Sequence, residues 1–344
     1  MQLEVATDVR PEDVFVVDPG PLKITEIRVL GPNRMQMLAA APHAGRYTVR
    51  LGYLTQLLTW TAAYTLTTTA ARKHGVLRGT LAVTNATGIG FTRVRLSVVD
   101  ADQILARERA ADRLAVKPVK GTPSGPVPRE LGIVDLGAGN TRVELLPALQ
   151  RELRAVLVYD PIGTRLDRNL EYPVRDASLG IHPPATPQVT ESLELRRDGA
   201  LTAGLPGGSV RLFERRADGT LAALGEARMF ESATRVADSD LLPVRTAEGV
   251  SGSRARRELT VDDDNARIVE ELEISIENRR AHPIEVVLRE HLYRNQTWHL
   301  AYYSSYVIAK QEGAQQISLR IAVPARTKSK VLYVVVYPWK KAQR

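Results

Sequence analysis

Apolar and polar residues alternate with a period of two along most of this chain. Clear alternating runs are Tyr47–Tyr53, Trp60–Leu66, Leu81–Val83, Val94–Val98 and Leu272–Ile276. Because successive side chains of a β-strand point to opposite faces, each run places one apolar face against a core and one polar face in water. Helical periodicity is weak, and Ile104–Val116 is the best candidate for a short helix. The pattern predicts an all-β protein of tandem antiparallel sandwiches with at most one or two short helices.

Turn residues separate these runs at short intervals. Asn85–Gly88, Arg216–Gly219 and Asn278–Pro283 each lie between two alternating runs. Asn, Asp and Gly tolerate the left-handed backbone that tight turns require, so these segments predict hairpin connections. Proline and glycine are concentrated in Lys117–Arg129 and His182–Pro187, which predicts loops inserted within a domain rather than linkers between domains. Between these two loops we expect further strands at Gly132–Leu136, Thr141–Leu146 and Leu153–Tyr159.

The length of 344 residues favours two or three domains. We expect N-terminal strands or an arm in residues 1–45. A β-sandwich should follow in 46–240, with loop insertions near 101–130 and 161–188, and an immunoglobulin-like sandwich in 241–344. Leu81-x-Val83-x-Asn85 and Leu272-x-Ile274-x-Ile276-x-Asn278 are each followed by a turn and another alternating run. This repeated pattern indicates a duplicated unit.

Composition excludes several kinds of chemistry. The chain has no cysteine, which rules out disulfides, zinc–thiolate sites and thiol catalysis. It has a formal net charge of +8, but pairs such as Arg196–Arg197 and Arg279–Arg280 have carboxylates close by. Such dispersed charge is typical of a solvated surface, so nucleic acid is an unlikely partner in this interpretation. No apolar stretch is long enough to span a membrane, and Met1–Arg10 does not resemble a signal peptide.

Catalytic and cofactor motifs are not recognisable. Gly121–Gly125 has its serine in the wrong place for a nucleophile elbow, and Gly88-Ile-Gly90 lacks the next glycine of a dinucleotide fingerprint. Asp262–Asn265 is the densest acidic cluster, but Arg267 stands where a calcium loop needs glycine. We expect a charged hairpin tip there, no bound metal and no cofactor.

One region nevertheless carries candidate ligand-binding residues. Glu290, His291, Trp298, His299 and Tyr302 would converge if the residues between them form a turn. Aromatic side chains offer rigid surface to sugars and proteins, and strict alternation would place Trp298 and Tyr302 on one face and Tyr303 on the other. The alternative is that these aromatic residues simply pack in a core.

Several segments resemble the bacterial domain-of-unknown-function 4139 family, a group of mucoidy-inhibitor-like conserved proteins. The segments are Tyr53–Tyr64, Leu81–Leu96, Leu205–Phe213, Ile274–Glu290 and Val331–Tyr337. The resemblance implies tandem β-sandwiches in secreted or envelope-associated proteins with no established activity, and it supplies no catalytic residues. The absence of a signal peptide in this chain departs from that pattern.

We therefore expect a non-catalytic structural or protein-interaction module, such as a self-assembling subunit of a bacterial cell-surface or particle assembly. Its partner would be a second copy or another protein, reached by pairing edge strands at Asp13–Asp18 or Lys23–Leu30. The alternative is a glycan-binding protein or glycan-active enzyme that uses the Glu290–Tyr306 region.

Overall fold

The computed structural model describes residues 1–31, 33–99, 128–162, 170, 172–181, 185–201, 205–229, 239–313 and 315–340. Strands dominate these residues, and the helical elements among them are two single turns, η1 (Pro11–Asp13) and η2 (Gly199–Leu201). The predicted all-β class is confirmed. The expected helix at Ile104–Val116 lies outside the described residues. Within the described part of the chain, no helix is long and apolar enough to cross a membrane.

The chain forms two compact units. The first comprises Met1–Tyr64 and Leu77–Leu149, and the second comprises Thr65–Val76 and Gln150–Arg344. Three strands contribute residues to both units: β6 (Leu58–Thr69), β7 (His74–Asn85) and β10 (Gly139–Tyr159).

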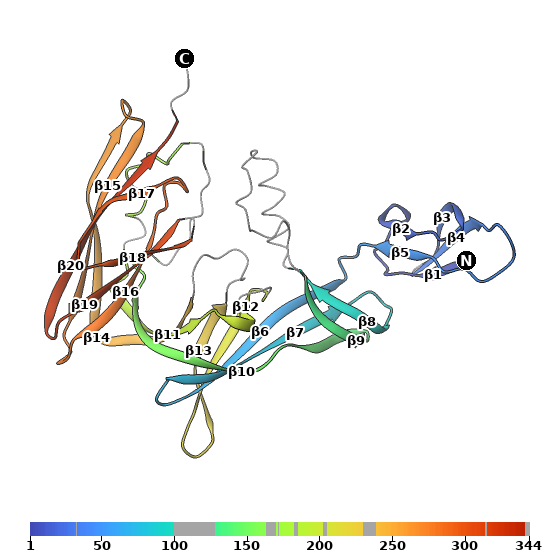
Figure 1. Ribbon diagram of the computed structural model, residues 1–344, viewed down its shortest axis with the longest axis horizontal. Coiled ribbons are helices and arrows are strands. Elements are labelled where there is room, and N and C mark those ends of the chain that lie inside the picture. Colours follow the sequence, from blue (N-terminus) through green and yellow to red (C-terminus); the bar gives the residue numbers. More distant parts are fainter. Residues whose placement is uncertain are drawn as a thin grey trace. The chain divides into compact units, whose positions relative to one another are not determined.

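Small sheets make up much of the first unit (Figure 1). The strands are β1 (Gln2–Glu4), β2 (Val14–Asp18), β3 (Lys23–Gly31), β4 (Arg34–Ala40), β5 (Arg50–Tyr53), β8 (Phe91–Val98) and β9 (Arg129–Leu136). One sheet has the order β1-β4-β3, and the pairs β2-β5 and β8-β9 form sheets of their own. Val5, Ala6, Val9 and Met35 form a small buried core beneath the first of these sheets.

Most strands of the second unit belong to two layers that enclose a large core. The strands are β11 (Gln188–Arg196), β12 (Gly208–Arg215), β13 (Leu221–Met229), β14 (Ser239–Asp262), β15 (Arg267–Asn278), β16 (Ile284–His291), β17 (His299–Tyr303), β18 (Ile308–Gly313), β19 (Gln316–Val323) and β20 (Thr327–Pro338). One layer runs β11-β14-β15-β20-β17, and the other runs β10-β16-β19-β18. Core residues come from both layers, for example Ile274 and Tyr333 from the first and Leu288 and Leu319 from the second.

Strand pairing in this unit follows the predicted alternation, with two differences. The hairpin predicted at Arg216–Gly219 is confirmed, since β12 and β13 pair across it. The runs expected at Thr141–Leu146 and Leu153–Tyr159 are parts of the single strand β10, which passes through Pro147 without ending. The end of β10 also pairs with β16 in parallel, whereas the sequence predicts only antiparallel neighbours.

A buried asparagine ends β7 and fixes the turn that follows it. The Asn85 side chain donates through Nδ2 to the carbonyl oxygens of Ile89 at 2.8 Å, Leu136 at 3.3 Å and Gly137 at 3.1 Å. Its Oδ1 accepts a hydrogen bond of 3.1 Å from the backbone N–H of Thr87. This one side chain therefore ties the end of β7 to the end of β9.

The same arrangement ends β15. Asn278 donates through Nδ2 to the carbonyls of His282 at 3.0 Å, Val323 at 3.3 Å and Pro324 at 2.9 Å. Its Oδ1 accepts from the backbone N–H of Arg280 at 3.0 Å. Here the side chain ties the end of β15 to the end of β19, so the repeated sequence pattern corresponds to a repeated hydrogen-bonding scheme.

Candidate functional site

Four charged residues occupy core-facing positions of the second unit. Glu270 precedes Leu272, Ile274 and Ile276 in the alternation of β15, and Glu290 follows Leu288 in that of β16. Arg254 and Arg256 pair in β14 with Ile274 and Leu272 of β15, so they share the core face. Charges in phase with apolar residues are costly unless they are paired, so their partners determine the role of this site.

Arg254 and Glu290 form a buried ion pair. The Nε of Arg254 lies 3.0 Å and 2.9 Å from the two carboxylate oxygens of Glu290, and the two side chains are 3% and 0% exposed. Burial raises the pKa of Glu290, and the Arg254 guanidinium opposes that rise. The guanidinium also donates to the carbonyl of Gly180 at 2.8 Å. Both charges therefore have hydrogen-bond partners within the protein.

Glu270 is held by three other side chains. Tyr293 donates its hydroxyl to Glu270 Oε1 at 2.7 Å, and Arg294 donates to both carboxylate oxygens at 3.2 Å and 3.3 Å. Arg256 Nη1 lies 3.5 Å from the same Oε1. Glu270 and Arg294 are both completely buried. We call these six residues the arginine–glutamate network: Arg254, Arg256, Glu270, Glu290, Tyr293 and Arg294.

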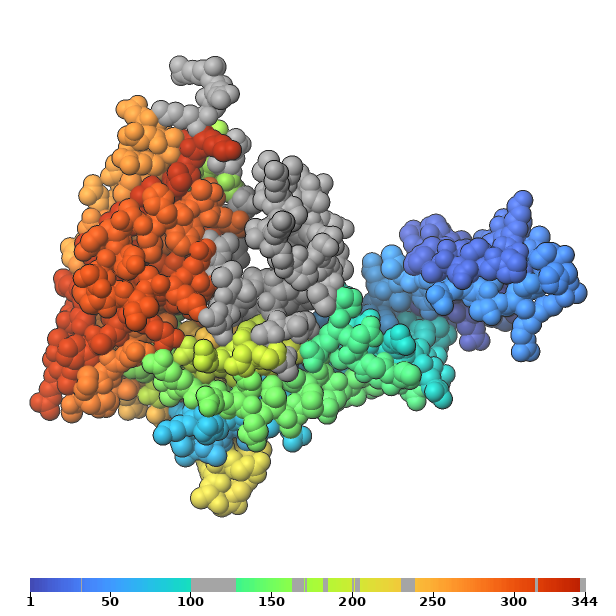
Figure 2. Space-filling view, in the orientation of Figure 1, coloured from blue at the N-terminus to red at the C-terminus, as the bar shows by residue number. Residues whose placement is uncertain are grey.

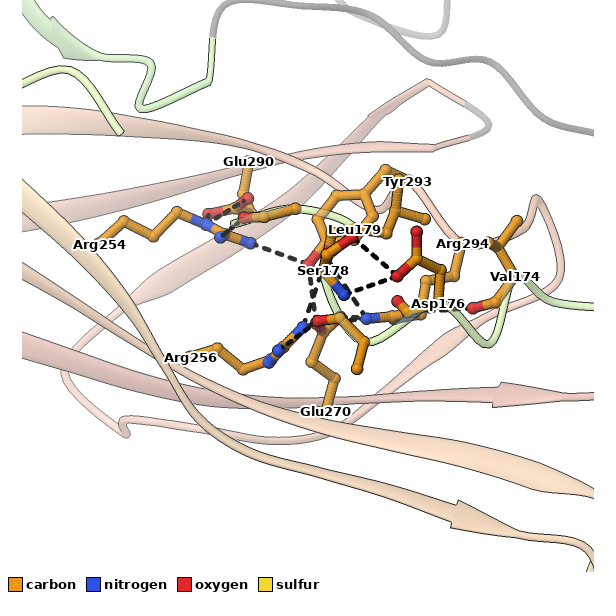
Figure 3. A network of polar contacts seen from close by, with 12 residues as sticks. Val174, Asp176, Ser178, Leu179, Arg254, Arg256, Glu270, Glu290, Tyr293 and Arg294 are labelled. Carbon is orange, nitrogen blue, oxygen red and sulfur yellow. Dashed lines mark hydrogen bonds and ion pairs between the residues drawn. The ribbon is translucent and has the colours of Figure 1, made fainter. Parts of the chain in front are cut away.

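The remaining donors of this network hold the segment 172–181 (Figure 3). Arg294 donates to the carbonyls of Val174 at 2.7 Å and Asp176 at 3.1 Å, and Arg256 donates to that of Ala177 at 2.5 Å. The network contains three arginines and two glutamates, so it carries one excess positive charge. The backbone carbonyl oxygens that accept these hydrogen bonds stabilise that charge. Through these bonds the network attaches the segment to the sandwich.

Close packing completes this attachment. Gly180 has φ of +80°, and a Cβ placed there would lie 2.0 Å from the ring of Tyr293. The guanidinium groups of Arg254 and Arg294 lie 5.6 Å and 5.5 Å from the centre of the same ring. Such contacts are favourable for cations beside aromatic rings. The arrangement is that of a structural anchor, because each carboxylate is paired with a guanidinium and the remaining guanidinium donors bind backbone carbonyls.

The residues proposed from the sequence divide into two groups. Glu290 and His291 are buried, and Glu290 belongs to the network. Trp298 is partly buried against the core, and His299 and Tyr302 are exposed on β17. The structure therefore separates Glu290 from the exposed aromatic residues instead of placing all five in one site.

A pocket of about 400 Å³ lies beside Trp298. Trp298, His299 and Tyr303 line it together with Lys310 and Gln311 of β18. Tyr302 is not among the lining residues, although it is 52% exposed. Strict alternation predicted the opposite assignment of the two tyrosines. A β-bulge between Leu300 and Tyr302 explains the difference, because it adds one residue to β17 relative to β20.

The network was not predicted, although a sequence signal for it exists. Glu270 and Glu290 lie in phase with the apolar residues of their strands, whereas Glu271 and Glu273 lie in the polar phase. An acidic residue in the apolar phase requires a buried partner. The identity of that partner depends on how the two layers pack, which alternation does not specify.

The other charged clusters are neutralised locally. Asp262–Asn265 connects β14 to β15, as predicted, and Asp262 accepts hydrogen bonds from Asn265 and Arg267. Within the described residues, no group of three or more His, Asp or Glu side chains is arranged to hold a metal ion. Arg197 pairs with Asp240 at 2.6 Å, and Arg280 pairs with Glu191 at 3.2 Å. These pairs match the dispersed charge seen in the sequence.

Comparison with known proteins identifies neither a family nor a function for this chain. The resemblance to the 4139 family stays a prediction. The chain matches no protein-family model, and no curated protein matches it either.

Proposed function

We propose that this protein is a non-catalytic structural and protein-interaction module whose copies associate through β2. The carboxylates of the buried network are neutralised by arginine, which supports a structural role for the second unit. The observation that carries the proposal is the exposure of apolar side chains on an N-terminal strand with a free edge.

Strand β2 exposes three consecutive apolar residues. Phe15, Val16 and Val17 are 52%, 37% and 54% exposed. Figure 2 shows the N-terminal strands to which β2 belongs in blue. In the described part of the chain, β2 pairs only with β5, so its other edge has unpaired backbone groups. Soluble proteins usually protect such an edge with charges or a covering loop, because it readily pairs with another strand.

A second copy of β2 is a suitable partner for that edge. In antiparallel pairing centred on Val16, Phe15 of each copy would lie opposite Val17 of the other. Aromatic and β-branched side chains stabilise each other in such cross-strand positions. Asp18 would lie opposite Val14 rather than opposite another carboxylate, so the pairing brings no like charges together. This two-fold arrangement uses the same surface on both copies.

Charge substitutions at Val16 test the proposal. Sedimentation velocity should show association of the wild-type chain that increases with protein concentration. Val16→Lys and Val16→Glu should each be monomeric, because two like charges would face each other across the two-fold axis. An equal mixture of the two variants should associate again, because Lys would then face Glu.

Leu54→Lys is the matched control. Leu54 is 74% exposed and lies between β5 and β6, outside any strand, so its substitution should leave association unchanged. A wild-type chain that stays monomeric at every concentration would contradict the proposal. So would a mixture of the Val16 variants that fails to associate.

The finer expectations from the sequence are part of the same proposal. An immunoglobulin-like arrangement of the second unit is supported by its two facing layers and by the asparagine-anchored connection between β15 and β16. Membership of the 4139 family is supported by the motifs of the sequence alone.

A further inference from the structure

We propose that the pocket beside Trp298 binds a pyranose sugar and does not cleave it. This inference is independent of association through β2, because the pocket belongs to the second unit and β2 to the first.

The pocket lies where the core of the second unit opens to solvent. β17 pairs only with β20 and β18 only with β19 among the described strands, so each forms the edge of its layer. Leu300 and Tyr303 pair with Val335 and Tyr333, which face the core. The core-facing residues of both edges therefore meet at this opening.

Strand β18 contributes its core-facing residues in the same way. Ala309 and Gln311 pair with Leu319 and Ile317, both of which belong to the core. The two layers thus supply an apolar floor, which includes Ile317, and side chains that stand at the rim. The pocket volume of about 400 Å³ is within the range of small-ligand sites.

The lining has the chemistry that recognises a sugar ring. Trp298 packs against the core on one side, which restricts its motion, and Tyr303 is 41% exposed. Flat aromatic surfaces bind the apolar C–H face of a pyranose with little loss of conformational entropy. The amide of Gln296 and the imidazole of His299 offer donors and acceptors for hydroxyl groups at the rim.

The same lining argues against hydrolysis. Glycosidases of the common types use two carboxylic acids on either side of the scissile bond. No Asp or Glu of the described residues lines this pocket, and Glu290, the acidic residue proposed from the sequence, is paired with Arg254. Binding without cleavage is therefore the expected activity.

Adjacent tyrosines provide a matched test. We would titrate the protein with maltotriose, cellotriose, chitotriose and mannotriose and follow tryptophan fluorescence, with isothermal titration calorimetry as a second measurement. At least one sugar should bind, and Trp298→Phe should remove most of the fluorescence change. Tyr303→Ala should weaken that binding by about 2- to 12-fold, the range expected for one aromatic contact.

Tyr302→Ala is the control, because Tyr302 is more exposed than Tyr303 but lies outside the pocket. It should bind the sugar as tightly as the wild-type chain does. Gln296→Ala gives a second variant that leaves the aromatic residues in place, and it should also weaken binding. If no sugar binds at about 10 mM, which is ten times a weak millimolar Kd, the inference is wrong. Equal losses for Tyr302→Ala and Tyr303→Ala would overturn it as well.

Discussion

Asn85 and Asn278 make equivalent hydrogen bonds in two separate units of this chain. Each donates to the carbonyl four residues later and to two consecutive carbonyls at the end of a distant strand. Each accepts from the backbone N–H two residues later. The two side chains are 2% and 1% exposed, so water does not readily replace these bonds.

Replacing either asparagine with aspartate should destabilise its unit by about 3 kcal/mol, since a buried carbonyl that loses its donor costs about 1–3 kcal/mol. Aspartate retains the acceptor for the turn but removes the Nδ2 donor. Urea unfolding of Asn85→Asp and Asn278→Asp would measure the loss. Asn140→Asp, at an exposed position, should change stability little. Equal effects at all three positions would show that the buried donors do not matter.

Alternation and turn residues were enough to predict this part of the fold. The strands before and after Asn278 have strict apolar phases, and the turn between them contains Asn and Pro. The hydrogen bonds from Asn278 to Val323 and Pro324 were not predictable, because they join residues that are distant in sequence. The continuity of β10 through Pro147 was not predictable either, because proline is uncommon inside strands.

Glu290→Gln should destabilise the second unit by about 3–5 kcal/mol, because it leaves the buried Arg254 charge without its counter-ion. The double variant Arg254→Met with Glu290→Leu should recover a large part of that loss, since both charges are then absent. Urea unfolding of the wild-type chain, Arg254→Met, Glu290→Leu and the double variant gives the coupling energy between the two residues. A double variant less stable than Glu290→Gln would contradict this prediction.

Gly180→Ala should cost clearly more than Gly219→Ala. The two glycines have similar φ angles, +80° and +85°, so both substitutions introduce similar backbone strain of about 1 kcal/mol. A Cβ at Gly219 meets open space, whereas one at Gly180 meets the Tyr293 ring. The added steric cost should release the segment 172–181. Limited proteolysis should therefore cut Gly180→Ala within that segment sooner than it cuts Gly219→Ala.

Stability should fall at acidic pH, in part through Glu191. Burial alone would raise the pKa of Glu191. Hydrogen bonds from Arg245 at 2.6 Å and Arg280 at 3.2 Å lower this pKa by more than burial raises it, so the net pKa is below that of a free glutamate. A lowered folded-state pKa stabilises the protein above the unfolded-state pKa of about 4.3, and this contribution is lost as pH falls through the folded-state value.

Glu191→Gln removes that contribution. The variant should be less stable than the wild-type chain at neutral pH, and the two stabilities should converge as pH falls below about 4. Urea unfolding at a series of pH values would measure both. A difference that stays constant across the series would exclude Glu191 as a source of the pH dependence.

Because β17 contains a bulge, the number of residues between Leu300 and the tyrosines determines which tyrosine ring can contact a ligand. Ala301 is the extra residue, and it allows both Leu300 and Tyr303 to face the core although they are three positions apart. Deleting Ala301 should straighten the strand and leave Tyr303 where it is. Inserting one more residue there, with the bulge retained, should shift the register by one position, so that Tyr303 turns toward solvent and Tyr302 toward the core. A single-codon insertion would thus exchange one tyrosine ring for the other at this surface, with every aromatic residue retained.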